Sequence, residues 1–208
     1  MKPSFKFYRG CYRFARVALG IFLWYDIRGR GNIPPGAAMV CANHSSLLDP
    51  IHVSLAFSID DFIHYIAKVE LYRIPVLSAV IQMLGAISVD REMLDVTTIK
   101  NTLTYFKKGE KVAIFPEGTR VSENESVAAK NGAIKLAEKA EVPIVPVYIP
   151  RKKYIFRKLP LVIGEPYHIE KQTRKRSTDE YSKLVEELMV RIEALKPTKP
   201  TKGAGVRV

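Results

Sequence analysis

The sequence has few cysteines and no long unbroken apolar run, and both absences limit what the protein can be. Cys11 and Cys41 are the only cysteines in 208 residues, too few for a disulfide framework or a cysteine-rich metal site. The uncharged stretch Ile74 to Val89 is interrupted by proline, glutamine and glycine, whereas a spanning helix needs roughly 20 apolar residues. The short apolar run Val17 to Tyr25 lacks a small-residue cleavage site, which argues against a signal peptide. We therefore expect a reducing compartment and no transmembrane helix.

Acidic residues are also scarce, and the cations that outnumber them gather at the two ends of the chain. Lys and Arg total 33 against 21 Asp and Glu, a net charge of +12. Residues 1–30 carry +6 of this charge and residues 170–208 carry +4. Such an excess indicates an anionic partner: a nucleic acid, a lipid surface or a phosphorylated substrate. Since no zinc-finger spacing, RNP-like strand or GXXG loop is present, we expect no nucleic-acid binding.

Residues 1–30 interleave their cations with aromatic side chains and are predicted to be a helical segment. Arg9, Arg13 and Arg16 follow the i, i+4, i+7 spacing that places side chains on one helical face. A basic and aromatic helix suits the headgroup layer of an anionic membrane, where seven cations together contribute on the order of 5 kcal/mol. The pattern also fits an amphipathic helix that packs on its own domain and keeps its cations in water. The first interpretation makes the segment a peripheral or monotopic membrane attachment.

A cluster of glycines and prolines from Gly29 to Gly36 separates this segment from the main domain, which we place at residues 31–195. Short apolar runs alternate there with helix-length segments, which is typical of an α/β fold with a mixed, mostly parallel sheet covered by helices. The predicted strands are 37–42, 63–67, 86–89, 112–115 and 144–149. The predicted helices are 95–108, 127–140 and 178–195. Residues 196–208, rich in Lys, Pro and Gly, are predicted to be a flexible tail.

The strongest candidate for chemistry is the segment Asn43 to Pro50, which follows a predicted strand. His44 and Asp49 would lie about 140° apart on a continuous helix, so they can pair only across a strand-to-helix turn. Ser46 and Asp49 have the spacing of a capping box, and Pro50 is tolerated in a first helical turn. A carboxylate paired with one imidazole nitrogen leaves the other free as a general base for a hydroxyl. The alternative is that Asp49 only caps a helix and His44 only ends a strand.

Two further segments follow predicted strands and combine glycine with charged residues. In Phe115 to Arg120, the glycine allows a ligand to approach the backbone, and Arg120 offers a guanidinium fork that suits a phosphate. Alternatively, Glu117 and Arg120 form a surface ion pair that closes a turn. The segment Gly85 to Arg91 also ends in a charged pair, which by itself indicates little.

Other site chemistries lack the residues that they need. The four histidines form no H-E-x-x-H arrangement and have no supporting cysteine cluster, so we expect neither a metal nor another cofactor. The two serines that follow His44 do not lie in a G-x-S-x-G elbow, which argues against a serine nucleophile.

Taken in order, these segments resemble the sequence blocks of the glycerolipid acyltransferase family. The N-H-x-x-x-x-D block matches Asn43 to Asp49, G-x-I-x-x-D-R matches Gly85 to Arg91, and F-P-E-G-T-R is unaltered at Phe115 to Arg120. The V-P-[IV]-[VI]-P block matches Val142 to Pro146, and Lys68 to Leu71 is similar to the family's K-x-E-L segment. The resemblance covers about residues 30–165.

This resemblance implies transfer of a fatty acyl group from acyl-CoA or acyl carrier protein to the free sn-2 hydroxyl of lysophosphatidic acid, giving phosphatidic acid. It implies that His44 deprotonates the hydroxyl for direct attack on the thioester, that Asp49 orients His44, and that no acyl-enzyme is required. The implied substrate-binding residues are Lys68, Arg91, Glu117, Gly118, Thr119 and Arg120. The three cations among them, Lys68, Arg91 and Arg120, would hold the acceptor phosphate. Backbone N–H groups near His44 or Gly118 would stabilise the oxyanion. The implied location is the cytoplasmic face of the cell membrane.

Two other functions fit the same residues. The enzyme could acylate another acceptor, such as glycerol 3-phosphate or a lyso-amino-lipid, with the same His44 and Asp49. A non-catalytic peripheral protein that carries or senses anionic lipid would need the cations but would have no use for His44. Assays with a panel of acceptors would distinguish lysophosphatidic acid from the other acceptors. Turnover by the wild-type protein that is lost in His44→Ala would exclude the non-catalytic alternative.

Overall fold

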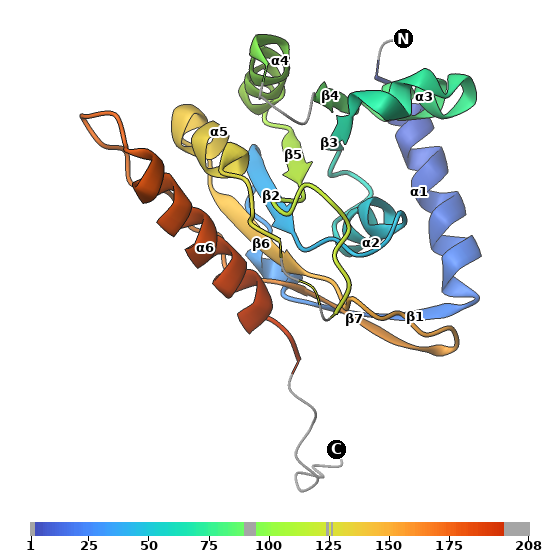
Figure 1. Cartoon of the computed structure of the whole chain (residues 1–208). Coiled ribbons are helices and arrows are strands. Elements are labelled where there is room, and N and C mark those ends of the chain that lie inside the picture. Colours follow the sequence, from blue (N-terminus) through green and yellow to red (C-terminus); the bar gives the residue numbers. More distant parts are fainter. Residues whose placement is uncertain (1–2, 90–94, 124, 126, 198–208) are drawn as a thin grey trace, which may run out of the picture.

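A seven-stranded sheet with helices on both faces organises the chain (Figure 1). The computed structural model describes residues 3–89, 95–123, 125 and 127–197. The strands are β1 (Leu23–Arg28), β2 (Ala38–Ala42), β3 (Ile63–Lys68), β4 (Ile87–Val89), β5 (Lys111–Ile114), β6 (Ile144–Tyr148) and β7 (Arg157–Ile163). The α-helices are α1 (Phe5–Gly20), α2 (Asp49–Ala56), α3 (Pro75–Met83), α4 (Val96–Lys107), α5 (Gly132–Ala140) and α6 (Thr178–Ala194). Two short 3-10 helices, η1 (Arg30–Asn32) and η2 (Val69–Arg73), complete the described elements.

The strand order is β1-β7-β6-β2-β5-β3-β4. Five neighbouring strands, from β6 to β4, are parallel, whereas β7 pairs antiparallel with β6 and parallel with β1. The sheet is therefore mixed and mostly parallel, which confirms the predicted fold class. β2 lies between β5 and β6, and all five of its residues are buried. Its sequence, Ala-Met-Val-Cys-Ala, has the continuous apolar character of a strand that is covered on both faces.

Alternate residues of β2 point into two separate cores because successive strand side chains face opposite sides of the sheet. Val40 belongs to a core that α2 closes with Val53 and Phe57. Met39 belongs to the other core, which α4, α5 and α6 cover from the opposite face. Leu188 of α6 is fully buried in this second core. The central strand is thus held from both sides, and its carboxyl end has a fixed position.

The structure corrects the prediction that residues 1–30 are helical. The helix ends at Gly20, and residues 23–28 form β1, an edge strand of the sheet. The physical reason is an alternation of apolar residues, because Leu23 is buried and Tyr25 and Ile27 pack against the same core. β7 was not predicted either, since it opens with the cations Arg157 and Lys158 and is not apolar throughout. The pairing between β1 and β7 closes this side of the sheet.

The first helix packs on its own domain with one face and leaves apolar residues on the other. The Tyr8 hydroxyl donates to the Asp61 carbonyl at 2.8 Å, and the Tyr12 hydroxyl donates to the Phe57 carbonyl at 3.1 Å. Phe14 and Val17 are exposed on the outer side. Among the described residues, no helix is both long enough and apolar enough to cross a bilayer.

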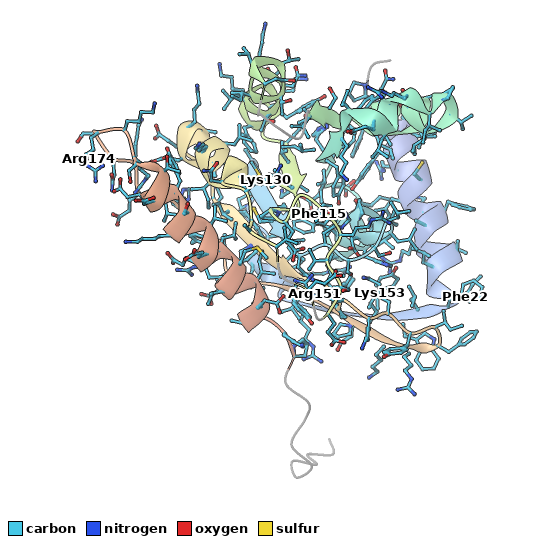
Figure 2. All side chains as sticks on the ribbon, in the orientation of Figure 1. Phe22, Phe115, Lys130, Arg151, Lys153 and Arg174 are labelled. Atoms are coloured by element: carbon cyan, nitrogen blue, oxygen red, sulfur yellow. The ribbon has the colours of Figure 1, made fainter. Side chains whose placement is uncertain are left out.

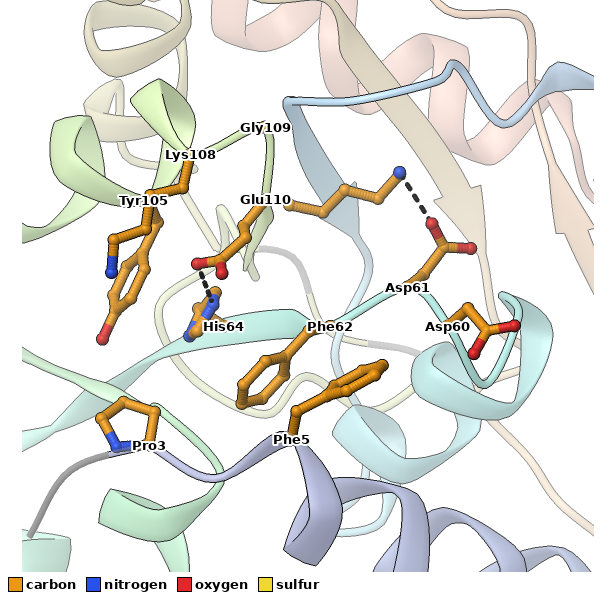
Figure 3. A pocket seen from close by; sticks show the side chains of 11 residues that line it. Pro3, Phe5, Asp60, Asp61, Phe62, His64, Tyr105, Lys108, Gly109 and Glu110 are labelled. Atoms are coloured by element: carbon orange, nitrogen blue, oxygen red, sulfur yellow. Dashed lines mark hydrogen bonds and ion pairs between the residues drawn. The ribbon is translucent and has the colours of Figure 1, made fainter.

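A hollow of about 680 Å³ lies at the amino ends of β3 and β5, the edge opposite the predicted site (Figure 3). Several of its ionisable side chains pair with one another. Lys111 pairs with Asp61 at 2.7 Å, and His64 Nε2 lies 2.9 Å from the carboxylate of Glu110. The Nδ1 atom of His64 contacts the carbonyl of Gly85 at 2.9 Å. These contacts make His64 a structural histidine.

We predict that Gly85→Ala destabilises the protein by about 1–3 kcal/mol. Gly85 has φ +71°, and a methyl group there would overlap the buried His64 ring, so the variant combines backbone strain with overpacking. Chemical denaturation measures the effect. Gly10→Ala is the matched control, because Gly10 lies within α1 with open space around it and alanine is favoured in a helix by about 0.5–1 kcal/mol. Equal stability of wild type and Gly85→Ala would contradict the close contact.

Candidate active site

The candidate site lies where the parallel strands β2 and β6 end. Asn43, the residue after β2, bridges the two chain segments: its side-chain amide donates to the Ile149 carbonyl at 2.6 Å and accepts the Ile149 N–H at 2.8 Å. Asn43 is fully buried. This paired contact fixes the point at which the chain leaves the sheet, and His44 follows directly.

The structure brings His44 and Asp49 together across a strand-to-helix turn. His44 Nδ1 lies 3.0 Å from Asp49 Oδ2, and the same oxygen accepts the N–H groups of Ser45 at 2.6 Å and Ser46 at 2.7 Å. The predicted capping box is wrong, because α2 begins at Asp49 itself and the Ser46 hydroxyl accepts the N–H of Leu48 instead. The Asp49 carboxylate therefore closes the turn as well as holding the imidazole.

Asp49 stays ionised although it is fully buried. Burial is the largest single effect and raises its pKa, but the hydrogen bond with His44, the charge of Lys153 and the backbone N–H of Ser45 together lower the pKa to about 2. A carboxylate can only accept, so His44 Nδ1 carries the proton and Nε2 presents its lone pair. The His44 ring stacks on Phe115, with centroids 4.2 Å apart and planes 19° apart. This arrangement fixes the orientation of the imidazole, which could then serve as a general base.

Glu117 has a place that the sequence did not predict. Its carboxylate accepts the backbone N–H of His44 at 2.6 Å and pairs with Arg151 at 2.6 Å, and the residue is only 4% exposed. The alternative ion pair between Glu117 and Arg120 does not form, because Arg151 takes that position. The backbone carbonyl of His44 in turn accepts the N–H of Val121 at 2.8 Å. Glu117 thus anchors the His44 backbone and has little surface for a substrate.

The other predicted site residues occupy more open positions. Gly118 has φ +65° in a turn closed by its N–H and the Phe115 carbonyl at 2.9 Å. Thr119 is half-buried, and the side chain of Arg120 is exposed and forms no ion pair with any described residue. Lys68 ends β3 at the same edge of the sheet. Arg91 lies outside the described residues.

The expected oxyanion donors near His44 and Gly118 are already used. The N–H groups of His44, Ser45 and Ser46 bind carboxylates, and the Gly118 N–H binds a carbonyl. These four groups are therefore not free to form an oxyanion hole in this structure, and the expectation is wrong for them.

Two cations of the site were missed at the sequence level. Arg151 and Lys153 lie in the loop between β6 and β7, and Figure 2 shows both below Phe115. Lys153 Nζ is 2.9 Å from Asp49 Oδ1. The available signal was a run of cations directly after the predicted strand 144–149, because parallel strands deliver the residues after their carboxyl ends to one edge. No group of three metal-ligating side chains occurs among the residues described.

Comparison with known proteins identifies the family. The sequence profile of the Acyltransferase family matches residues 25–150, which is more than half of the chain. The chain belongs to this acyltransferase family. The matched region of this acyltransferase contains His44, Asp49 and the loop from Phe115 to Arg120.

Individual relatives agree with this assignment. The acyltransferase is 31% identical over 194 residues to the 1-acyl-sn-glycerol-3-phosphate acyltransferase of Bacillus subtilis, a match that covers 90% of this chain and 96% of the relative. It is 34% identical over 149 residues to a probable 1-acyl-sn-glycerol-3-phosphate acyltransferase of Mycoplasma pneumoniae, covering 66% of this chain and 56% of that one. Its fold is similar to the crystal structure of PlsC, the 1-acyl-sn-glycerophosphate (LPA) acyltransferase of Thermotoga maritima. That match has a TM-score of 0.65 and 27% identity, and it covers 92% of this chain and 78% of the other.

We predict that the acyltransferase loses stability as the pH falls from 7 to 5 because of His52. Burial, the largest effect, and the nearby charge of Lys153 lower the pKa of this fully buried histidine to about 4. The unfolded chain therefore binds a proton below about pH 6.5 that the folded protein takes up only near pH 4, which costs about 2 kcal/mol at pH 5.

Denaturant unfolding of wild type and His52→Phe at both pH values measures this cost. The free-energy loss between pH 7 and pH 5 should be about 2 kcal/mol smaller in the variant. The same pH dependence in both proteins would show that His52 is not held in its neutral form.

Proposed function

We propose that this acyltransferase transfers a fatty acyl group from an acyl thioester to the free sn-2 hydroxyl of lysophosphatidic acid, and so forms phosphatidic acid. The observation that carries the proposal is the pairing of His44 Nδ1 with the buried Asp49 carboxylate, which leaves Nε2 as a base. The activities of the relatives, which are acyltransferases for 1-acyl-sn-glycerol-3-phosphate, support the acceptor. The donor is acyl-CoA or acyl carrier protein thioester.

In the proposed mechanism, His44 Nε2 takes the proton from the acceptor hydroxyl as its oxygen attacks the thioester carbonyl. Asp49 stabilises the imidazolium that forms. Collapse of the tetrahedral intermediate breaks the C–S bond, leaving the ester and expelling a thiolate, which takes the proton from His44 and departs as the thiol. No acyl-enzyme is needed. Arg120, exposed beside the His44 turn, holds the acceptor phosphate together with Lys68 and Arg91.

We predict that His44→Ala lowers turnover by at least about 10²-fold, because general-base catalysis contributes typically 10²- to 10⁴-fold. Purified protein is incubated with lysophosphatidic acid vesicles and either donor, and phosphatidic acid is measured by mass spectrometry. His168→Ala is the matched control, since His168 is exposed after β7 and away from the site. If more than about a tenth of the activity survives in His44→Ala, His44 is not the base. Product from another acceptor alone, such as glycerol 3-phosphate, would redirect the proposal within the family.

We also propose that the protein docks peripherally on an anionic membrane beside this site. Exposed apolar side chains gather where α1 meets the edge of the sheet, and Phe22 contacts Phe156 with ring centroids 6.0 Å apart. We call this group the apolar tip; it comprises Ile21, Phe22, Trp24, Tyr154, Ile155 and Phe156, each at least 46% exposed. Three of its residues, Tyr154 to Phe156, directly follow Lys153 in the chain. A membrane that contacts the apolar tip would therefore lie close to His44. The exposed cations Arg157 and Lys158 flank it.

We predict that Phe22→Ser combined with Ile155→Ser weakens binding to anionic vesicles at least about tenfold. Removing an apolar side chain from lipid costs about 1.5–3 kcal/mol when its burial is complete, and these two side chains are partly exposed in the free protein. Vesicle co-sedimentation measures the loss. Val190→Ser, at an exposed position of α6, is the control and should bind as wild type does. Unchanged binding of the double variant would move the membrane contact elsewhere. Substitutions are preferable to deleting residues 1–25, because α1 and β1 belong to the packed fold.

A further inference from the structure

Lys153 contacts Asp49 through the carboxylate oxygen that His44 does not use. Its Nζ lies 2.9 Å from Asp49 Oδ1 and donates to Ser45 Oγ at 2.9 Å, and its side chain is only 12% exposed. Oδ1 is buried and, among the residues that the structure describes, has no hydrogen-bond partner. The ion pair with Lys153 therefore offsets the cost of removing this charged oxygen from water.

We propose that Lys153 is a positioning residue for the acyl transfer. Through its ion pair with Asp49 and its hydrogen bond to Ser45, it holds the carboxylate in the orientation that fixes His44. A buried carboxylate that loses such a charged partner must rotate, take up water or become protonated, and each change loosens the imidazole. This inference rests on the proposed function above.

The lysine also balances the charge of the site. With His44 neutral, the Asp49 carboxylate and the Lys153 ammonium cancel, so the resting cluster has no net charge. Without the ammonium, the His44–Asp49 pair would take up its extra proton at a higher pH, whichever atom holds it. The neutral base would then be populated only in more alkaline solution. Among the described residues, His52 from α2 and Glu117 from the loop after β5 face this cluster. Behind them, Tyr25 from β1 contacts His52, Arg151 from the loop after β6 pairs with Glu117, and Glu193 from α6 pairs with Arg151.

A role in binding the acceptor phosphate would require a different environment. A phosphate-binding cation needs an accessible, uncommitted head group, as Arg120 has. The Lys153 ammonium forms an ion pair with Asp49 and donates a hydrogen bond to Ser45, and its side chain is largely covered. We therefore expect removal of Lys153 to lower kcat and to leave the acceptor KM nearly unchanged.

The test compares Lys153→Met, Lys153→Gln and Lys153→Arg with wild type. Lys152→Met is the matched control, because Lys152 is the neighbouring lysine, is 63% exposed and pairs with Glu123 at the surface. Lys153→Met should lower kcat roughly ten- to hundredfold, change the acceptor KM less than about twofold, and move the acidic limb of the kcat/KM profile upward by roughly one pH unit. Lys153→Arg should retain the wild-type limb. Lys153→Gln, which keeps a donor but lacks the charge, should show the same shift and replaces Lys153→Met if that variant does not fold.

A second readout does not depend on acyl transfer. Diethyl pyrocarbonate acylates unprotonated histidine, and peptide mass spectrometry follows its reaction with His44 from pH 5 to pH 8. The midpoint of this reaction should rise in Lys153→Met and Lys153→Gln but not in Lys153→Arg or Lys152→Met. If wild type shows no transfer to lysophosphatidic acid and the midpoint still rises, the proposed function fails while the positioning role stands.

Two results would overturn the positioning role. One is an acceptor KM that rises in Lys153→Met while kcat is unchanged, which would make Lys153 a phosphate-binding cation. The other is a uniform loss of activity in Lys153→Met and Lys153→Arg with neither the pH limb nor the reaction midpoint displaced, which would make its contribution merely structural.

Discussion

The site depends on the contacts of one buried group, the Asp49 carboxylate. One of its oxygens accepts the N–H groups of Ser45 and Ser46 and thereby shapes the turn between β2 and α2. The same oxygen holds His44, and the other faces Lys153. A charge can remain in this interior only because hydrogen bonds and an opposite charge offset its desolvation. The group that forms the turn is therefore also the group that orients the His44 imidazole.

The two edges of the sheet differ in what their side chains do: the candidate site lies at the carboxyl ends of the parallel strands, and the opposite edge carries paired, structural side chains. The carboxyl ends of β2 and β6 are tied by Asn43, and the loops that follow β5 and β6 supply Glu117 and Lys153 around His44. At the opposite edge, the ionisable side chains around His64 pair with one another. Part of the apolar tip directly follows Lys153 in the chain, so the proposed membrane contact would lie beside His44.

Much of the fold could be predicted because parallel strands buried on both faces have continuous apolar sequences. β1 and β7 were missed, since β1 follows a basic and aromatic helix and β7 opens with cations. The pairing of His44 with Asp49 could be predicted because the residues around them indicate a strand-to-helix turn, which brings the two side chains together. The run of cations after the strand 144–149 could have placed Lys153 at this edge of the sheet. Its pairing with Asp49 could not be predicted, because the two residues are more than a hundred positions apart and only the strand order brings them together. Glu117 was assigned to substrate, whereas burial commits it to His44 and Arg151.

The proposed chemistry requires that Asp49 hold His44 with its proton on Nδ1 and its lone pair on Nε2. Long-range ¹H–¹⁵N NMR spectra of ¹⁵N-histidine-labelled protein report this directly, with His44→Gln used to assign the signals. At neutral pH, the account predicts a protonated Nδ1 and an unprotonated Nε2 for His44, and loss of this preference in Asp49→Asn. A proton on Nε2 in the wild-type protein would contradict the account, because the nitrogen that has to accept the hydroxyl proton would already be occupied.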